Sequence, residues 1–148
     1  MIRHNRASLC VSSDKCSVAQ ITEMLGVEPE RSGDIGDPTP SGRAGRNLTP
    51  PYARYQRTFW CLHEDADDTD AEDQTGFSAV RKVVDRVLPV AHKLADLRND
   101  GETIIWWSGD SDSTQGGFVL EADLLAKISV LGCHLYGTTF LGEEGSAT

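Results

Sequence analysis

The chain has 148 residues, 39% hydrophobic and 25% charged, which is ordinary for a globular protein and argues against global disorder. This length falls in the usual range for one domain, so we expect a single domain over residues 1–148. The net charge of −9 argues against holding nucleic acid or an anionic membrane through a broad basic surface.

The segment before Ser12 is too short and too interrupted to be the apolar part of a signal peptide. No apolar run approaches the roughly 20 residues that cross a bilayer, so we expect a cytoplasmic protein without membrane contact. The cysteines, which form no C-x-x-C pair, predict reduced thiols, with a disulfide as the alternative that a cytoplasmic location disfavours. They are Cys10, Cys16, Cys61 and Cys133.

The amino-terminal half begins with a strand and a helix. Apolar and polar residues alternate over 7–13, which is typical of a half-buried strand. Residues 17–25 show helical spacing and end at Gly26, a residue suited to a helix cap. Residues 27–54 are rich in proline and glycine and predict a long loop, the first place to look for activity.

The middle of the chain predicts a strand, an acidic loop and a kinked helix. Alternation resumes over 55–62, and the acidic run over 64–73 should be a solvated loop. Apolar residues then follow helical spacing over 77–97, where Pro89 should kink or restart the helix.

The carboxy-terminal part predicts two strands, a helix and a last strand. Residues 102–108 include four contiguous apolar residues and indicate a central strand covered on both faces, continuing through a polar hairpin tip to a strand at 118–120. A helix should end at Gly132, followed by a strand over 133–141 and a tail over 142–148 that should fray.

This order of elements predicts an α+β fold, with a mixed sheet of four or five strands and helices mainly on one face. We expect one sheet to contain Leu9, Val11, Phe59, Cys61, Ile104, Trp106, Val119 and Leu135.

Several short motifs lie at characteristic places along this order of elements. They are Leu25-Gly26-Val27 with Pro29, Gly36-Asp37, Arg57-Thr58-Phe59-Trp60, Trp106-Trp107 and Gly117-Phe118-Val119-Leu120. Together they resemble the bacterial domain of unknown function 4279 from about Leu9 to Phe140. The resemblance implies a small stand-alone bacterial domain with no established activity, so it supplies no catalytic residues.

Two patterns could bind metal. Asp110, Asp112, Thr114 and Glu121 match the oxygen-ligand spacing of a calcium loop, but Gln115 stands where that loop needs glycine, so we interpret the segment as a hairpin tip. Cys61 and His63 could supply two ligands of a zinc site, and His134 could approach as a third. The sequence offers no clear set of four ligands. We therefore expect no metal and no cofactor.

The chain lacks the G-x-S-x-G and phosphate-loop signatures, so we name no catalytic residue, although the sequence does not exclude an enzyme. The candidate binding residues lie in or beside the long loop, where arginine forks could recognise carboxylate or phosphate. They are Arg31, Asp37, Arg43, Arg46, Arg54, Arg57 and Trp60. Pairing of these arginines with the protein's own acids is the interpretation we favour.

Two classes of function remain. The first is a non-catalytic protein-binding or regulatory module, for example an immunity-like protein that occludes another protein, for which an acidic surface suits a basic target. The second is a domain that binds a small anionic ligand, or acts on it, through the arginine-bearing loop 31–57. The oligomeric state stays open.

Overall fold

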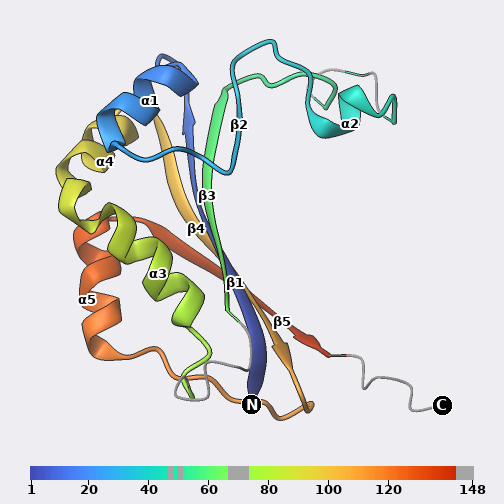
Figure 1. Cartoon of the computed structure of the whole chain (residues 1–148), viewed down its shortest axis with the longest axis vertical. Helices are drawn as coiled ribbons and strands as arrows, with labels where there is room; N and C mark the ends of the chain where they lie inside the picture. The colour runs from blue at the N-terminus through green and yellow to red at the C-terminus, as the bar shows by residue number, and fades with distance from the viewer. Residues whose placement is uncertain (47–48, 50–51, 67–73, 143–148) are drawn as a thin grey trace.

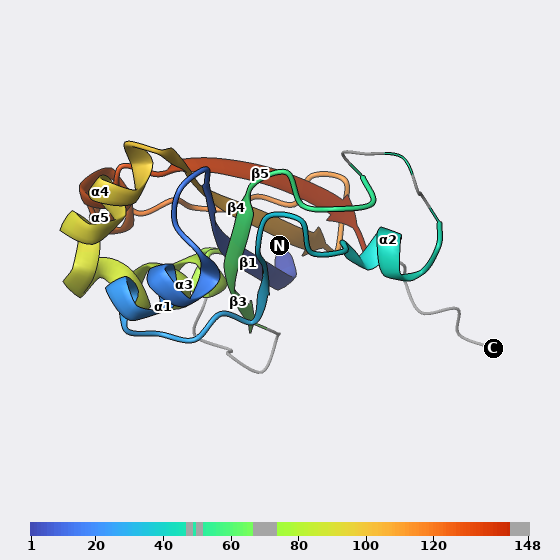
Figure 2. The same cartoon turned by 90° about the horizontal axis from the view of Figure 1, so that it is seen from above.

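The computed structural model describes residues 1–46, 49, 52–66 and 74–142. A five-stranded sheet carries one layer of helices on a single face (Figure 1 and Figure 2). The elements are, in chain order, β1 (Ile2–Ser13), α1 (Val18–Leu25), β2 (Arg31–Gly33), α2 (Pro40–Arg43), β3 (Thr58–Ala66), α3 (Ser78–Val87), the 3-10 turn η1 (Leu88–Val90), α4 (Ala91–Arg98), β4 (Gly101–Ser111), α5 (Ala122–Leu131) and β5 (His134–Leu141).

The sheet is mixed, with the order β2-β3-β1-β4-β5. β1 lies at the centre and pairs antiparallel with β3 and β4, β2 pairs antiparallel with β3, and β5 runs parallel to β4. Helices α1, α3, α4 and α5 lie on the same side of the sheet, while α2 lies apart from them in the excursion between β2 and β3 (Figure 1). The predicted α+β fold with a mixed sheet and one-sided helices is confirmed.

The helices begin and end where local signals place them. Ser17 caps α1 in a reciprocal capping box with Gln20, and Gly26 ends the helix in the left-handed conformation with φ 71°. The predicted interruption at Pro89 is confirmed, since α3 and α4 are separated there by η1. None of the helices in the described ranges is long and apolar enough to cross a membrane.

The core fills the space between the helix layer and one face of the sheet. Its largest members include Trp60, Leu62 and Ile105 from the strands, all fully buried. The indole Nε1 of Trp60 donates to Thr22 Oγ1 at 3.0 Å, which joins β3 to α1. The indole of Trp107 donates to the Gly76 carbonyl at 2.9 Å, so both buried tryptophans satisfy their polar atom.

The prediction that the strand over 102–108 is central and covered on both faces is wrong. β4 is the second strand from the edge, and its side chains alternate between a buried and an accessible side. Ile105 and Trp107 point to the helices, whereas Trp106 is exposed to solvent. The sequence does not reveal this alternation, because the four contiguous apolar residues place apolar side chains on both faces of the strand.

The long connection over 27–54 has more structure than expected, since it contains β2 and α2. The predicted strand over 118–120 is absent from the described residues. Phe118 instead lies edge-on against Phe77 and Trp107, with ring centroids 5.5 Å apart in both pairs. Seven of the eight residues expected to share the sheet do so, and Val119 is the exception.

The acidic run begins inside a strand. β3 extends through Glu64 and Asp65 to Ala66, four residues beyond the predicted end of the strand at Leu62. The rest of the acidic run from 67 to 73 lies outside the described residues, as does the predicted fraying tail from residue 143 onward.

The expectation of four reduced thiols is also wrong, because Cys10 and Cys61 form a disulfide. They are directly opposed on the neighbouring strands β1 and β3, with Cα atoms 4.2 Å apart. Opposed side chains on antiparallel strands lie close enough to bond, but their register cannot be read from cysteines 51 residues apart. Cys16 is free and half-buried, and Cys133 is free and buried, which raises the pKa of its thiol.

Candidate functional site

The face of the sheet opposite the helices carries a mixture of aromatic, charged and hydroxyl side chains, which we call the open face. Side chains at alternate positions of a strand share a face, so the register assigns the members of this face. They are Arg31 of β2; Phe59, Cys61, His63 and Asp65 of β3; His4, Arg6, Ser8, Cys10 and Ser12 of β1; Glu102, Ile104, Trp106, Ser108 and Asp110 of β4; and His134, Tyr136, Thr138 and Phe140 of β5.

Three large aromatic side chains on β4 and β5 form an exposed patch, which we call the aromatic patch. Trp106, Tyr136 and Phe140 are 49%, 52% and 52% exposed. The parallel register places Tyr136 beside Trp106, and their ring centroids lie 5.0 Å apart. Exposed aromatic side chains that gather on one face are typical of interaction surfaces.

A hollow of about 340 Å³ lies beside the aromatic patch. The side chains on its wall include a guanidinium, an imidazole and three hydroxyls beside two aromatic rings. From the open face these are Arg6, Ser8, His63, Trp106, Ser108, Thr138 and Phe140. The hollow therefore offers apolar surface for one part of a guest and hydrogen-bonding groups for another.

A line of hydrogen bonds orients the imidazole in this wall. Ser8 Oγ lies 2.9 Å from His63 Nδ1, and His63 Nε2 lies 3.1 Å from Asp65 Oδ2. The residue types match those of a serine nucleophile with its base, but the setting does not. Ser8 is buried in the central strand, whose backbone pairs on both sides, so the strand offers no N–H groups to stabilise an oxyanion there. We interpret the line as positioning His63.

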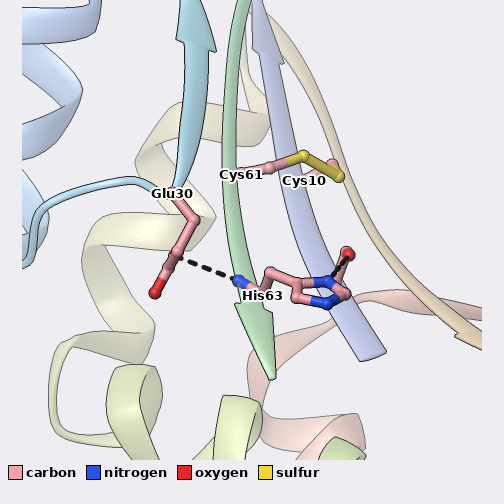
Figure 3. The surroundings of a disulfide bond; sticks show 5 residues. Cys10, Glu30, Cys61 and His63 are labelled. Atoms are coloured by element: carbon pink, nitrogen blue, oxygen red, sulfur yellow. Dashed lines mark hydrogen bonds between the residues drawn. A yellow bond between two sulfur atoms is a disulfide. The ribbon is translucent and has the colours of Figure 1, made fainter. Parts of the chain in front are cut away.

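The disulfide lies in the same neighbourhood. Figure 3 shows His63 on the side of β3 that carries the Cys10–Cys61 bond, with Glu30 reaching the His63 backbone N–H at 3.0 Å. The bond ties β1 to β3 two residues before His63. It also removes Cys61 from the zinc pattern considered above, and His134 lies on β5, which is separated from β3 by β1 and β4.

The acidic residues of the calcium-like pattern are engaged in ion pairs. Asp110 pairs with Arg6 at 3.4 Å, and Asp112 accepts from the amino terminus at 2.7 Å and from Arg3 at 3.1 Å. The hydrogen bond from the amino terminus is the main reason that the pKa of Asp112 lies below its usual value. Glu121 pairs with Arg81 at 2.6 Å, so each of the three carboxylates in this pattern forms ion pairs with different groups.

The arginines singled out in the loop do not converge on one site. Arg57 makes two hydrogen bonds to Asp14, at 2.7 and 3.3 Å, and Arg54 donates to the Gly36 carbonyl at 2.7 Å. Arg43 and Arg46 are exposed near α2. Arg57 therefore pairs with one of the protein's own acids, as the favoured interpretation expects.

The remaining sequence candidates divide between the open face, the loop and the core. Arg31 lies over the Phe59 ring at 6.0 Å and belongs to the open face. Asp37 accepts a hydrogen bond from the Asp34 N–H at 3.0 Å within the loop. Trp60 is fully buried under the helices.

Most of the open face was not predicted from the sequence. Arg6, Ser8, Tyr136 and Phe140 were not among the candidates, and His63 was considered only as a zinc ligand. Their common signal is the alternation of side chains along a strand, since all of them lie on the face opposite the core side of their strands. That signal could have found them once the core side of each strand was known.

A comparison with family models gives one match, to the domain of unknown function DUF4279, over residues 3–136. The chain is a member of the DUF4279 family. The match takes in all of the open face of this DUF4279 protein except Thr138 and Phe140. No curated protein and no solved structure matches the chain, so its function has to be argued from its own geometry.

Proposed function

We propose that this DUF4279 protein is a non-catalytic protein-binding module whose contact surface is the open face, centred on the aromatic patch. The observation that carries the proposal is the solvent exposure of three aromatic side chains on two adjacent strands, Trp106, Tyr136 and Phe140. Aromatic side chains in such a position supply large contact areas at low entropic cost and dominate many interfaces.

The surroundings of the patch support this role. Charged side chains of both signs lie on the same face, among them Arg6, Arg31, Asp65, Glu102 and Asp110. An apolar centre with a polar rim is the usual anatomy of a protein interface. The net charge of −9 suits a partner with a basic surface, as a regulatory or immunity-like protein would need for a basic target.

The alternative function is binding of a small anionic ligand. Its specific support is Arg6, which lines the hollow beside Trp106 and has a long 3.4 Å contact with Asp110. The loop arginines give it less support, because Arg54 and Arg57 are engaged locally. Arg43 and Arg46 stay within the protein-binding proposal as exposed residues that could extend the contact surface.

A site-specific photo-crosslinking experiment tests the proposed surface. The photoreactive residue p-benzoylphenylalanine replaces Tyr136 in the full chain, expressed in the source organism, and the matched control carries it at Val130, an exposed position of α5. We expect a discrete adduct with a protein other than this chain from position 136 and none from position 130. The adduct should disappear when Trp106→Ala is added.

Two results would count against the proposal. Equal adducts from both positions would mean non-specific contact, and no adduct from position 136 would mean that the open face meets no protein partner. An anionic small molecule recovered with the wild type, and lost on Arg6→Gln, would favour the alternative.

A further inference from the structure

β5 leaves one edge of the sheet unpaired. The sheet order ends with β5 on one side and β2 on the other, so each has a strand neighbour on one side only within the described part of the chain. β5 has eight residues and pairs with β4 along its whole length without a register shift, whereas β2 has three. A long edge strand presents a row of backbone N–H and C=O groups that another strand can bind.

The sequence of β5 carries none of the usual protections of an edge strand. Such strands are commonly shielded by charged residues, proline, bulges or a covering segment. The eight residues His-Leu-Tyr-Gly-Thr-Thr-Phe-Leu contain no Asp, Glu, Lys, Arg or Pro. All of them are exposed except Leu135, which is half-buried.

The opposite edge is protected. β2 is short, begins with Arg31 and is flanked by Glu30 and Asp34. Arg31 also lies over the Phe59 ring, which places a cation at that edge. The two edges therefore differ in both length and charge, and only β5 has the properties of a pairing strand.

The charge of the chain favours a second copy as the occupant at this edge. Two copies, each with a net charge of −9, repel one another over most of their surfaces. Along β5, however, neither copy presents an Asp, Glu, Lys or Arg side chain. An uncharged strand in a strongly acidic protein is where identical molecules can meet with the least repulsion.

We infer that β5 is a dimerisation edge, at which two copies of this chain pair their β5 strands antiparallel across a two-fold axis. The axis stands perpendicular to the sheet, so the same patch of each copy meets itself, as in most homodimers. The two five-stranded sheets become one continuous sheet. All helices then lie on one side, and the two open faces join on the other.

The pairing also explains why β5 carries exposed aromatic side chains. Tyr136 and Phe140 flank the middle of the strand on the open face. In the antiparallel pair, each faces the region occupied by the other in the second copy. Aromatic cross-strand pairs stabilise antiparallel sheets, so the two aromatic patches would form one patch across the axis. The inference shares Tyr136 and Phe140 with the proposed contact surface, but it rests on backbone pairing at the edge of β5 and not on the binding of another protein.

Light scattering coupled to size-exclusion chromatography tests the dimer with the full chain. We expect a mass of about 32 kDa, twice the 16.1 kDa of one chain. The disrupting variant is Thr138→Lys with Thr139→Lys, which places cations of both copies close together at the paired edge. We expect it to weaken dimerisation at least about tenfold. The matched control is Ser129→Lys with Val130→Lys on exposed positions of α5, which should leave the dimer intact.

The control separates the edge from overall charge. Both double variants raise the net charge from −9 by the same two units, so general repulsion falls equally in the two proteins. Loss of the dimer in the β5 variant alone therefore assigns the effect to the edge. A wild-type protein that stays at 16.1 kDa at all concentrations, or a dimer that survives the β5 change, would overturn the inference.

Amide hydrogen exchange gives a second readout that does not require a variant to fold. Successive residues of a parallel strand direct their backbone groups to opposite sides, so only alternate amides of β5 can bond to β4. In the dimer, both sets of β5 amides should be protected. Protection of the alternate set alone, in protein concentrated enough to associate, would contradict the pairing. Trp106→Ala should change neither the mass nor this protection, even if it abolishes the photo-crosslinked adduct.

Discussion

The two faces of the sheet use the same residue type in opposite ways. Trp60 and Trp107 lie under the helices, and each indole donates to an acceptor inside the protein, at 3.0 and 2.9 Å. Trp106, on the adjacent position of β4, lies on the other face and is exposed. Whether a tryptophan stabilises the fold or is available to a partner therefore depends on which face of the sheet it occupies, not on its residue type.

The largest expected effect comes from removing a tryptophan on the covered face. Trp60→Ala deletes a fully buried ring and leaves Thr22 Oγ1 without its donor. We expect the free energy of unfolding to fall by about 3–5 kcal/mol. Trp106→Ala, the matched change on the open face, should cost less than about 1 kcal/mol. Urea denaturation of both variants measures the difference, and equal losses would show that the open face is also structural.

The second prediction concerns the disulfide that fastens the open face. The loop closed by Cys10 and Cys61 spans 51 residues, so removing the bond should lower the free energy of unfolding by about 2–4 kcal/mol. The test variant is Cys10→Ser with Cys61→Ser, and Cys16→Ser is the control that leaves the bond in place. Unchanged stability in the double variant would mean that the strand ladder alone fixes β1 to β3.

Counting thiols connects this bond to the location of the protein. Thiols in the cytosol are normally kept reduced. The disulfide therefore conflicts with the expected cytoplasmic location. In protein alkylated at lysis, the bonded form should show two reactive thiols after unfolding, from Cys16 and Cys133. Reduction beforehand should raise the number to four. Four thiols without reduction would instead support the cytoplasmic expectation.

The smallest predicted effect concerns an ion-pair cluster on the helix side. Arg81 of α3 binds Asp123 at 2.9 Å and Glu121 at 2.6 Å, and the hydrogen bond from Arg81 lowers the pKa of Asp123. A lowered carboxyl pKa stabilises the fold above the unfolded-state value, and this contribution disappears as the pH falls through the folded-state value. Thermal unfolding between pH 6 and about pH 2 should therefore depend less steeply on pH in Arg81→Met than in the wild type. An identical acid profile would contradict the pairing.

Local sequence signals predicted much of the fold. The helical spacing over 17–25, the stop at Gly26 and the interruption at Pro89 act within a few residues of where they stand, so their effects can be read from the chain. The alternation over 7–13 gave the correct core side of β1, where Leu9 and Val11 are fully buried. These elements were sufficient to predict an α+β fold.

The site depended on information that acts across the chain. Which face of β4 is covered depends on how the helices pack against the whole sheet, and the run from Ile104 to Trp107 is apolar on both sides. The pairing of Cys10 with Cys61 and of Ser8 with His63 depends on the β1–β3 register. The loop arginines were chosen for their composition, but Arg57 turned out to pair with Asp14 across 43 residues.

The most direct test of the account compares the open face with the arginine-bearing loop in one experiment. Tagged full-length protein is recovered from the source organism, and the amount of co-purifying partner is quantified for the wild type and two variants. One variant combines Trp106→Ala with Tyr136→Ala, and the other replaces Arg43, Arg46 and Arg54 by Ala. The account predicts that the aromatic variant loses the partner while the arginine variant retains most of it, with little change in thermal stability for either. Retention of the partner by the aromatic variant, together with its loss from the arginine variant, would contradict the account and assign binding to the loop.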